Sequence, residues 1–202
     1  TVDSTFEDLS EDDWDWVMNI NLHGVINSSR AFLPYLKQRP EAALINTSSI
    51  FGMIVVKRQS VYHTAKFAVR GFTESLVKEH KESSVQIHSV HPGHIGTNIL
   101  GNARVNEAKE SANAFQRLMG KLASIGEDQE AMAAFFQRNG MHPSRAAQIM
   151  LNGVLKKRPR IFVGADAKLI DLCQRLMPIH YETLFPLITV PLTLLRNKKP
   201  IK

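Results

Sequence analysis

The 202-residue sequence holds a single cysteine, Cys173, and no apolar run long enough to cross a membrane. One cysteine excludes an internal disulfide, which is typical of proteins in reducing compartments. A membrane-spanning helix needs about 18 or more consecutive apolar residues, and no stretch reaches that length. No segment typical of a signal peptide opens the chain. We therefore expect a cytoplasmic protein.

Acidic residues are also scarce relative to basic ones: 19 aspartates and glutamates stand against 25 lysines and arginines, a net charge of +6. Much of the basic excess lies at 155–160 and 196–202. Such clusters attract phosphates or anionic lipids, although most of them are simply solvated surface. Aromatic residues are not interleaved with these basic residues as they are in nucleic-acid-binding surfaces, so we expect no nucleic-acid partner.

The tail at 183–202 is apolar at first and then basic, and it is too short to span a bilayer. Three roles stay open for it. It covers the substrate pocket, packs against a second subunit, or lies on a membrane surface as a peripheral contact.

Short apolar runs alternate with helical patterns along the rest of the chain. We expect strands at 42–49, 85–93 and 160–164, and helices at about 14–36, 60–80 and 142–157. This order predicts an α/β fold with parallel β-α-β units, right-handed crossovers and helices on both faces of the sheet. No internal repeat or linker divides the chain, so 1–202 is predicted to form a single domain. The polar, alanine-rich segment 98–142 is predicted to be an insertion that covers the substrate.

Several polar side chains are placed where parallel strands are expected to end. Ligands of open α/β sheets bind beyond the carboxyl ends of the strands. Ser49 ends the first expected strand, and the segment HPGHIGT at 91–97 ends the second. Tyr62 falls in the first turn of the helix that links them. These residues are therefore expected to meet in one crevice.

Tyr62 and Lys66 lie four positions apart, so a helix places them on one face. A free tyrosine has a pKa of about 10 and is a poor proton acceptor at neutral pH. A neighbouring ammonium group lowers that pKa by roughly 1–3 units, which would make Tyr62 a usable general acid or base. Ser49 would donate a hydrogen bond to an oxygen that gains negative charge.

The spacing of a serine, twelve residues, a tyrosine, three residues and a lysine resembles the signature of the short-chain dehydrogenase/reductase family. Four further segments are similar to that family: NINLHGV at 19–25, INTSSIFG at 45–52, AKFAVRGFTESL at 65–76 and PGHIGT at 92–97. The resemblance is good over roughly 10–97 and looser beyond. It implies a Rossmann-like, doubly wound parallel sheet and an NAD(P)-dependent oxidoreductase that interconverts a secondary alcohol and a ketone.

The resemblance also implies catalytic roles. Tyr62 would pass a proton to or from the substrate oxygen, and Ser49 would orient the carbonyl or alcohol. Lys66 would lower the pKa of the tyrosine and bind the nicotinamide ribose. Asn21 would hold a water molecule that extends a proton relay from Lys66.

Cofactor contacts are implied for the segment after the second expected strand. Ile95 would bind the carboxamide through its backbone, and Thr97 would lie near the carboxamide or the pyrophosphate. Pro92 and Gly93 would shape the turn that admits the nicotinamide ring. His94, beside this site, is a candidate substrate contact.

A lipophilic substrate is suggested by the apolar residues after Ser49. Phe51 is the substrate-binding candidate among them, and Met53, Ile54 and Val55 extend the same apolar segment. His88 and His91 have an odd spacing for a strand, and no cysteine or carboxylate completes a ligand set, so we expect no metal site. A serine hydrolase is disfavoured because NTSSIFG lacks the first glycine of G-x-S-x-G.

The sequence departs from the family pattern at its beginning. The glycine-rich T-G-x-x-x-G-x-G segment, the residue that selects NAD or NADP and the N-N-A-G segment are all missing. We therefore expect an N-terminally incomplete domain in which the choice between NAD and NADP is unreadable. The missing strands would leave the strand at 42–49 as an exposed edge, and the isolated piece should be poorly soluble or unfolded.

A second class of function stays open beside the enzyme. The chain could be a non-catalytic homologue or fragment that serves as a dimerising or membrane-docking module. The family commonly pairs its subunits through the two helices expected here at about 14–36 and 60–80. The resemblance therefore implies a homodimer or a homotetramer.

Overall fold

A computed structural model describes residues 1–105 and 129–184 of the chain and has the α/β architecture predicted from the sequence. The strands are β1 (Val2–Asp3), β2 (Ala42–Thr47), β3 (Val85–Pro92), β4 (Arg104–Val105) and β5 (Arg160–Val163). The α-helices are α1 (Glu11–Met18), α2 (Gly24–Leu36), α3 (Ser60–Glu79), α5 (Gln129–Asn139), α6 (Pro143–Leu155) and α7 (Ala165–Leu176). Short turns of other helix types lie at Asn19–His23, Ile50–Gly52 and Tyr181–Leu184.

The three predicted strands form one parallel sheet in the order β2-β3-β5. Ala42 pairs with Val85 at the start of β2, and Ser89 pairs with Arg160 at the start of β5. The central strand β3 is buried along most of its length, although its sequence alternates between apolar and polar residues, because strands and helices surround it. Among the described residues β2 is an edge strand, as predicted, and its Ile45 is exposed.

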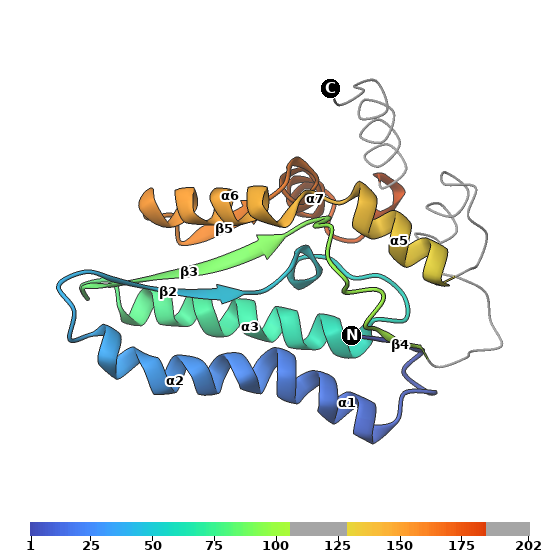
Figure 1. The fold of residues 1–202 in the computed structure, drawn as a ribbon, viewed down its shortest axis with the longest axis horizontal. Coiled ribbons are helices and arrows are strands. Elements are labelled where there is room, and N and C mark those ends of the chain that lie inside the picture. Colours follow the sequence, from blue (N-terminus) through green and yellow to red (C-terminus); the bar gives the residue numbers. More distant parts are fainter. Residues whose placement is uncertain (106–128, 185–202) are drawn as a thin grey trace.

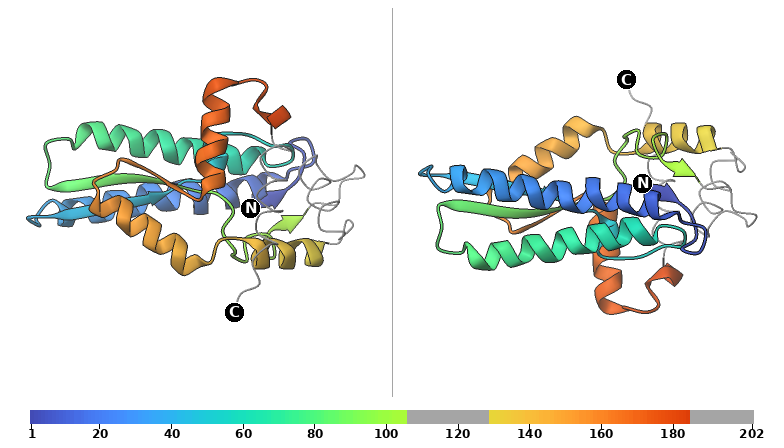
Figure 2. Two further views of the ribbon diagram at one scale, coloured as in Figure 1. Left: turned by 90° about the horizontal axis from the view of Figure 1, so that it is seen from above. Right: turned by 90° about the horizontal axis from the view of Figure 1, so that it is seen from below.

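Helices cover both faces of this sheet (Figures 1 and 2). On one face α2 and α3 lie side by side, and Leu76 of α3 packs with Val85 and Ile87 of β3. On the other face α6 and α7 cover β3 and β5. Gly153 allows α6 to approach closely, because a Cβ there would lie 2.6 Å from the Ile161 side chain.

The helix predicted at about 14–36 is interrupted. Its α-helical first part is capped by Ser10, whose hydroxyl accepts from the N–H of Asp13. A π-helical turn at Asn19–His23 then separates α1 from α2. Within this turn Asn21 donates to the carbonyl of Val17 at 3.1 Å, so its side chain competes for a backbone acceptor of its own helix.

The pair β1–β4 has no counterpart in the prediction. Each strand has only two residues, which is too short for a periodic pattern, and the pairing joins Val2 to Arg104 across a long stretch of sequence. Most of the predicted insertion 98–142 and of the tail 183–202 lies outside the described residues. Among the helices that the structure describes, none has the length and apolar character needed to cross a bilayer.

Candidate active site

Ser49, Tyr62 and Lys66 come together at the carboxyl end of β2. Ser49 directly follows this strand region, and α3 carries Tyr62 and Lys66 on one face, one helical turn apart. The Ser49 side chain forms a hydrogen bond with Tyr62, and the Lys66 Nζ lies 5.5 Å from the centre of the Tyr62 ring. Both α3 side chains are buried, with 8% of each residue exposed.

Burial dominates the electrostatics of this group. It raises the pKa of Tyr62 above its ordinary value, and the hydrogen bond from Ser49 only partly opposes this. Burial also lowers the pKa of Lys66 to about 8. The net shift of the Tyr62 pKa is therefore upward, because burial outweighs the hydrogen bond of Ser49. The predicted lowering by Lys66 stays a prediction.

Lys66 is held by the end of β2. Its ammonium group donates to the carbonyl of Thr47 at 3.2 Å, and its backbone carbonyl accepts a hydrogen bond from the Ser48 hydroxyl at 2.8 Å. Ser48 thus ties the end of β2 to the backbone of α3. Within the described parts of the chain no salt bridge joins a carboxylate to the Lys66 ammonium, which donates to a backbone carbonyl and lies near the Tyr62 ring.

The loop after β2 is fixed by two buried histidines that the sequence analysis did not assign to the site. His63 lies 3.0 Å from the carbonyl of Phe51 through Nδ1, and its Nε2 accepts from the N–H of Val56 at 2.9 Å. Since a carbonyl only accepts, Nδ1 carries the proton. Burial lowers the pKa of His63, which favours this neutral form.

His91 of β3 is the second of these histidines. Its Nδ1 lies 3.1 Å from the carbonyl of Ser49, and its Nε2 lies 2.9 Å from the Ser89 hydroxyl. The carbonyl again requires a proton on Nδ1, so Ser89 donates to Nε2. Burial lowers the pKa of His91 to about 4. A neutral imidazole therefore ties Ser49 to the central strand, and alternating polarity on a buried strand was the only sequence signal for it.

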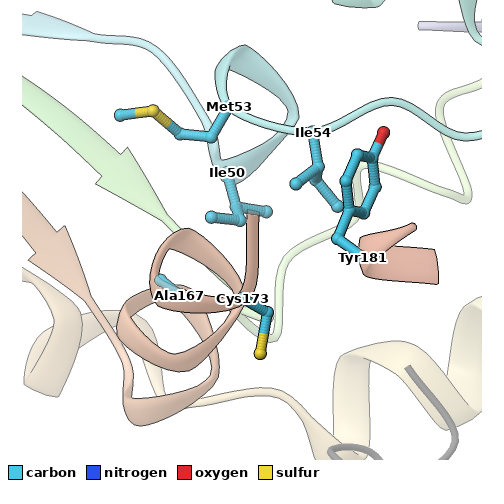
Figure 3. Close-up of a cluster of buried hydrophobic side chains, with 6 residues drawn as sticks. All are labelled: Ile50, Met53, Ile54, Ala167, Cys173 and Tyr181. Atoms are coloured by element: carbon cyan, nitrogen blue, oxygen red, sulfur yellow. The ribbon is translucent and has the colours of Figure 1, made fainter. Parts of the chain in front are cut away.

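Phe51 and the next residues are placed differently from what we expected of a substrate pocket. The Phe51 ring packs against Tyr62 and His63, with ring centres 6.3 and 4.9 Å apart. Met53 and Ile54, however, lie in a buried cluster (Figure 3). The members of this cluster are Ile50, Met53, Ile54, Ala167, Cys173 and Tyr181. The apolar run after Ser49 is thus mainly core, because α7 covers it.

Tyr181, which lies after α7, is the member of this cluster that comes last in the sequence. Its hydroxyl accepts from the N–H of Val55 at 2.9 Å and lies 3.3 Å from the Val55 carbonyl. Val55 itself is 45% exposed and borders an open hollow with Thr64 and Phe67. Thr64 and Phe67 lie on the opposite face of α3 from Tyr62, so this hollow is separate from the candidate site.

The loop after β3 carries the predicted cofactor contacts. Pro92 ends the strand, and the Gly93 N–H donates to the carbonyl of Val163 at 2.9 Å. Ile95 bridges to Met141, and the Thr97 N–H donates to the Ile95 carbonyl at 2.8 Å. The loop is therefore anchored to the neighbouring strand β5 and to the residues just before α6.

His94 and Asn21, the remaining predicted site residues, contact α5 and the carbonyl of Val17, respectively. The His94 ring stacks on Phe136 of α5 at 3.9 Å and its Nε2 lies 2.7 Å from the carbonyl of the same residue. Asn21 lies on the π-helical turn, which packs against α3. Among the described residues no group of three or more histidines, cysteines or carboxylates is arranged to hold a metal ion, and His88 bonds the Arg158 carbonyl.

Comparison with known proteins gives the same picture as the geometry. A family model described as short chain dehydrogenase matches residues 1–108. The chain is 37% identical over 185 residues to the Mycobacterium tuberculosis protein SadH, which is named as an oxidoreductase, covering 90% of this chain and 59% of that protein. It is 30% identical over 162 residues to a 3-ketodihydrosphingosine reductase of Bacteroides thetaiotaomicron, covering 78% of this chain and 56% of that enzyme.

The fold has solved counterparts as well. A short chain dehydrogenase/reductase from Burkholderia phymatum, crystallised in complex with NAD, superimposes with a TM-score of 0.67 at 19% identity, covering 86% of this chain and 61% of that one. At this identity the likeness shows the fold alone. The chain spans about three fifths of the length of the curated relatives it matches.

Proposed function

The chain belongs to the short-chain dehydrogenase/reductase family, and from this membership we propose that the protein containing it interconverts a secondary alcohol and a ketone with a nicotinamide dinucleotide. The observation that carries the proposal is the buried contact of Ser49, Tyr62 and Lys66. These are the three groups that such a reaction needs: a proton carrier, a hydrogen-bond donor and a cation that binds sugar hydroxyls.

Tyr62 is proposed to be the proton carrier. A bound nicotinamide supplies or accepts the hydride. The raised pKa of Tyr62 keeps its hydroxyl protonated at neutral pH, which suits a proton donor to the oxygen of a ketone under reduction. Ser49 bonds the same hydroxyl, and it is proposed to donate to the substrate oxygen as that oxygen gains negative charge.

Lys66 is proposed to hold the ribose of the cofactor. A buried ammonium without a carboxylate partner in the described residues calls for oxygen acceptors, and ribose hydroxyls supply them. Its pKa of about 8 keeps most of the lysine charged at pH 7. Asn21 would extend the proton relay from Lys66 through water.

The loop after β3 is proposed to bind the nicotinamide through Pro92, Gly93, Ile95 and Thr97. Its position at the carboxyl end of a parallel strand supports this, since cofactors of such sheets bind there. The Burkholderia phymatum protein of the same fold binds NAD. Either NAD or NADP fits the residues of this chain, because none of them corresponds to the segment that selects between the two.

A lipophilic alcohol or ketone is proposed as the substrate. The name of the Bacteroides relative, a 3-keto sphingoid reductase, supports this class. Phe51, which packs on Tyr62, and His94 are the proposed substrate contacts, and the segment 98–142 is the proposed lid.

Homodimers or homotetramers are proposed to form through the helices α2 and α3. Phe32 of α2 is 61% exposed and Phe67 of α3 is 38% exposed, so both helices present large apolar side chains to a partner. The predicted membrane contact of the tail rests on residues from 185 onward, which lie outside the described part, and it stays a prediction.

The decisive experiment is the substitution Tyr62→Phe in the full-length gene product. Turnover should fall by at least about a hundredfold, since the proton carrier is lost, while the dissociation constant for the cofactor stays within a few-fold. Turnover is followed by nicotinamide absorbance with a panel of alcohols and ketones. Tyr35→Phe is the matched control, because Tyr35 is 67% exposed on α2 and should keep full activity.

Two results would count against the proposal in different ways. A Tyr62→Phe protein with most of its activity would show that another group carries the proton. A wild-type protein that changes no nicotinamide absorbance with any member of the panel would refute the activity itself.

A further inference from the structure

We propose that Asp166, in the first turn of α7, is a positioning residue that sets the backbone of the nicotinamide-binding loop after β3. This inference rests on the proposed function, because it assigns a role in cofactor binding to a carboxylate that does not itself touch the Ser49–Tyr62–Lys66 group. Figure 1 shows why the contact is available: α7 begins directly after β5 and lies close to the carboxyl end of β3.

The Asp166 carboxylate accepts a hydrogen bond from one backbone group of the loop. Asp166 Oδ2 accepts from the N–H of His94 at 2.6 Å, which is a short, charge-assisted hydrogen bond. The two residues are 72 positions apart in sequence. Because the His94 N–H belongs to the peptide unit between Gly93 and His94, the orientation of that whole planar unit is fixed.

Two glycines make room for this carboxylate. A Cβ on Gly93 would lie 2.3 Å from Oδ2 of Asp166, and a Cβ on Gly164 would lie 2.0 Å from Oδ1. Gly164 also has a φ of 115°, a conformation that side chains strongly disfavour. β3 and β5 are thus each followed by a glycine, and the Asp166 carboxylate occupies the space that a side chain at either position would need.

The next peptide unit of the loop is fixed from the opposite direction. The His94 carbonyl accepts from the N–H of Met141 at 2.9 Å, and the Gly96 N–H donates to the Met141 carbonyl at 2.9 Å. The His94 carbonyl and the Ile95 N–H share one planar unit, so the direction of the Ile95 N–H is set as well. Asp166 and Met141 together hold the two successive peptide units that lead to Ile95.

A dinucleotide would bind tightly only if this backbone is ordered beforehand. Ile95 is the residue proposed to bind the carboxamide through its backbone, and a loop that must be ordered on binding costs affinity. Asp166 therefore acts on the cofactor through the backbone of the loop. An effect on the affinity for the cofactor distinguishes this role from a purely structural one.

The test measures dinucleotide affinity in the full-length protein by NADH and NADPH fluorescence titration. Asp166→Ala should raise the dissociation constant on the order of tenfold, the scale expected for losing a hydrogen bond to a charged group. Asp166→Asn keeps an acceptor oxygen and should stay within about threefold of the wild type. The kcat of Asp166→Ala at saturating cofactor should change less than its KM for the cofactor.

A second pair of variants tests the seat of the carboxylate by thermal unfolding. Gly93→Ala should lower the melting temperature in the wild-type background, because the new methyl group meets the carboxylate. In the Asp166→Ala background the same substitution should cost little. If Asp166→Ala does not fold, Asp166→Ser replaces it, since the serine side chain also ends short of the position of the carboxylate oxygens.

The outcomes separate this inference from the proposed function. If the wild type binds dinucleotide and Asp166→Ala binds it equally well, the role of Asp166 is refuted and the proposed function stands. If Gly93→Ala lowers the melting temperature equally in both backgrounds, the carboxylate does not occupy the space next to Gly93. If the wild type binds neither dinucleotide, both the proposed function and the positioning role fall.

Discussion

The loops that follow β2 and β3 lie beside each other at the same end of the sheet, but they are held in different ways. In the first loop most anchors come from α3, the next helix along the chain: Val56 and Phe51 bond His63, 7 and 12 residues away, and Ser48 bonds Lys66, 18 residues away. In the second loop His94 is held by Phe136 and Asp166, 42 and 72 residues away.

This difference explains which part of the site a sequence motif contains. The first loop and its helix form a local unit, so the spacing of Ser49, Tyr62 and Lys66 is enough to specify their meeting. The second loop takes its shape from segments that approach it only in the folded protein. We expect substitutions in the first loop to affect folding more strongly than comparable substitutions in the second.

The largest effect on stability is expected for His91→Ala, because the ring of His91, which lies in β3, holds the backbone of the first loop at Ser49. This change removes a fully buried ring and leaves the Ser49 carbonyl and the Ser89 hydroxyl without their partner, which should lower the free energy of unfolding by about 2–4 kcal/mol. His94→Ala, in the second loop, is the matched comparison and should cost about 1 kcal/mol. Urea unfolding measures both, and equal losses would contradict the contrast drawn between the loops.

Mild acid should weaken the first loop in the same way. The pKa of His91 is lowered to about 4 in the folded protein, whereas an unfolded histidine titrates near 6.5. Between these values the unfolded chain binds more protons, so the stability contributed by the neutral ring is complete above about pH 6.5 and falls as the pH approaches about 4. The loss from this residue should reach up to about 3 kcal/mol.

The variant His91→Asn is the control for this pH dependence, since asparagine does not titrate and its amide still donates to the Ser49 carbonyl. Stability measured by urea unfolding from pH 7 to pH 4 should depend less on pH in this variant than in the wild type. His63, whose pKa is also lowered by burial, contributes a slope of the same sign in both proteins. An unchanged pH dependence in His91→Asn would assign the titration to other groups.

A smaller effect is expected from Gly52→Ala. A Cβ at this position would lie 2.4 Å from the Ser48 hydroxyl oxygen and 2.8 Å from the Lys66 carbonyl, so the loop would have to move at a cost of about 1–3 kcal/mol. Gly71→Ala on α3 is the control, because nothing lies within 4 Å of its Cβ position. That change should stabilise the helix by roughly 0.5–1 kcal/mol. Thermal unfolding that ranks the two variants in the reverse order would show that the loop is not tightly packed.

The sequence predicted the parallel sheet, the helices on its two faces and the meeting of Ser49 with Tyr62, because each depends on a period or a spacing within one β-α-β unit. It did not predict the π-helical turn at Asn19–His23, since one inserted residue shifts the apolar pattern by a single position, which so short a stretch does not distinguish from an ordinary irregular helix. The burial of Met53 and Ile54 was also missed, because the helix that covers them lies more than a hundred residues later.

The raised pKa of Tyr62 shows a further limit of the motif. The sequence identifies Lys66 as a charged neighbour, but it contains no direct measure of how much water the folded protein leaves around the two groups. Asp166 was hidden for the opposite reason. In the sequence it looks like an ordinary acidic residue at a helix start. Its position becomes apparent only in the fold, where β3 and β5 bring Gly93 and Gly164 next to its carboxylate.

The hydrogen bonds between Tyr181 and Val55 have a consequence for the order of assembly, since the two residues are 126 positions apart. A ribosome makes the serine, the tyrosine and the lysine of the site long before it makes Tyr181. Until that residue emerges, the backbone of Val55 lacks both of its hydrogen bonds to the Tyr181 hydroxyl. The nascent chain therefore carries Ser49, Tyr62 and Lys66 well before the loop after β2 gains its hydrogen bonds to Tyr181, which form only when synthesis reaches the segment after α7.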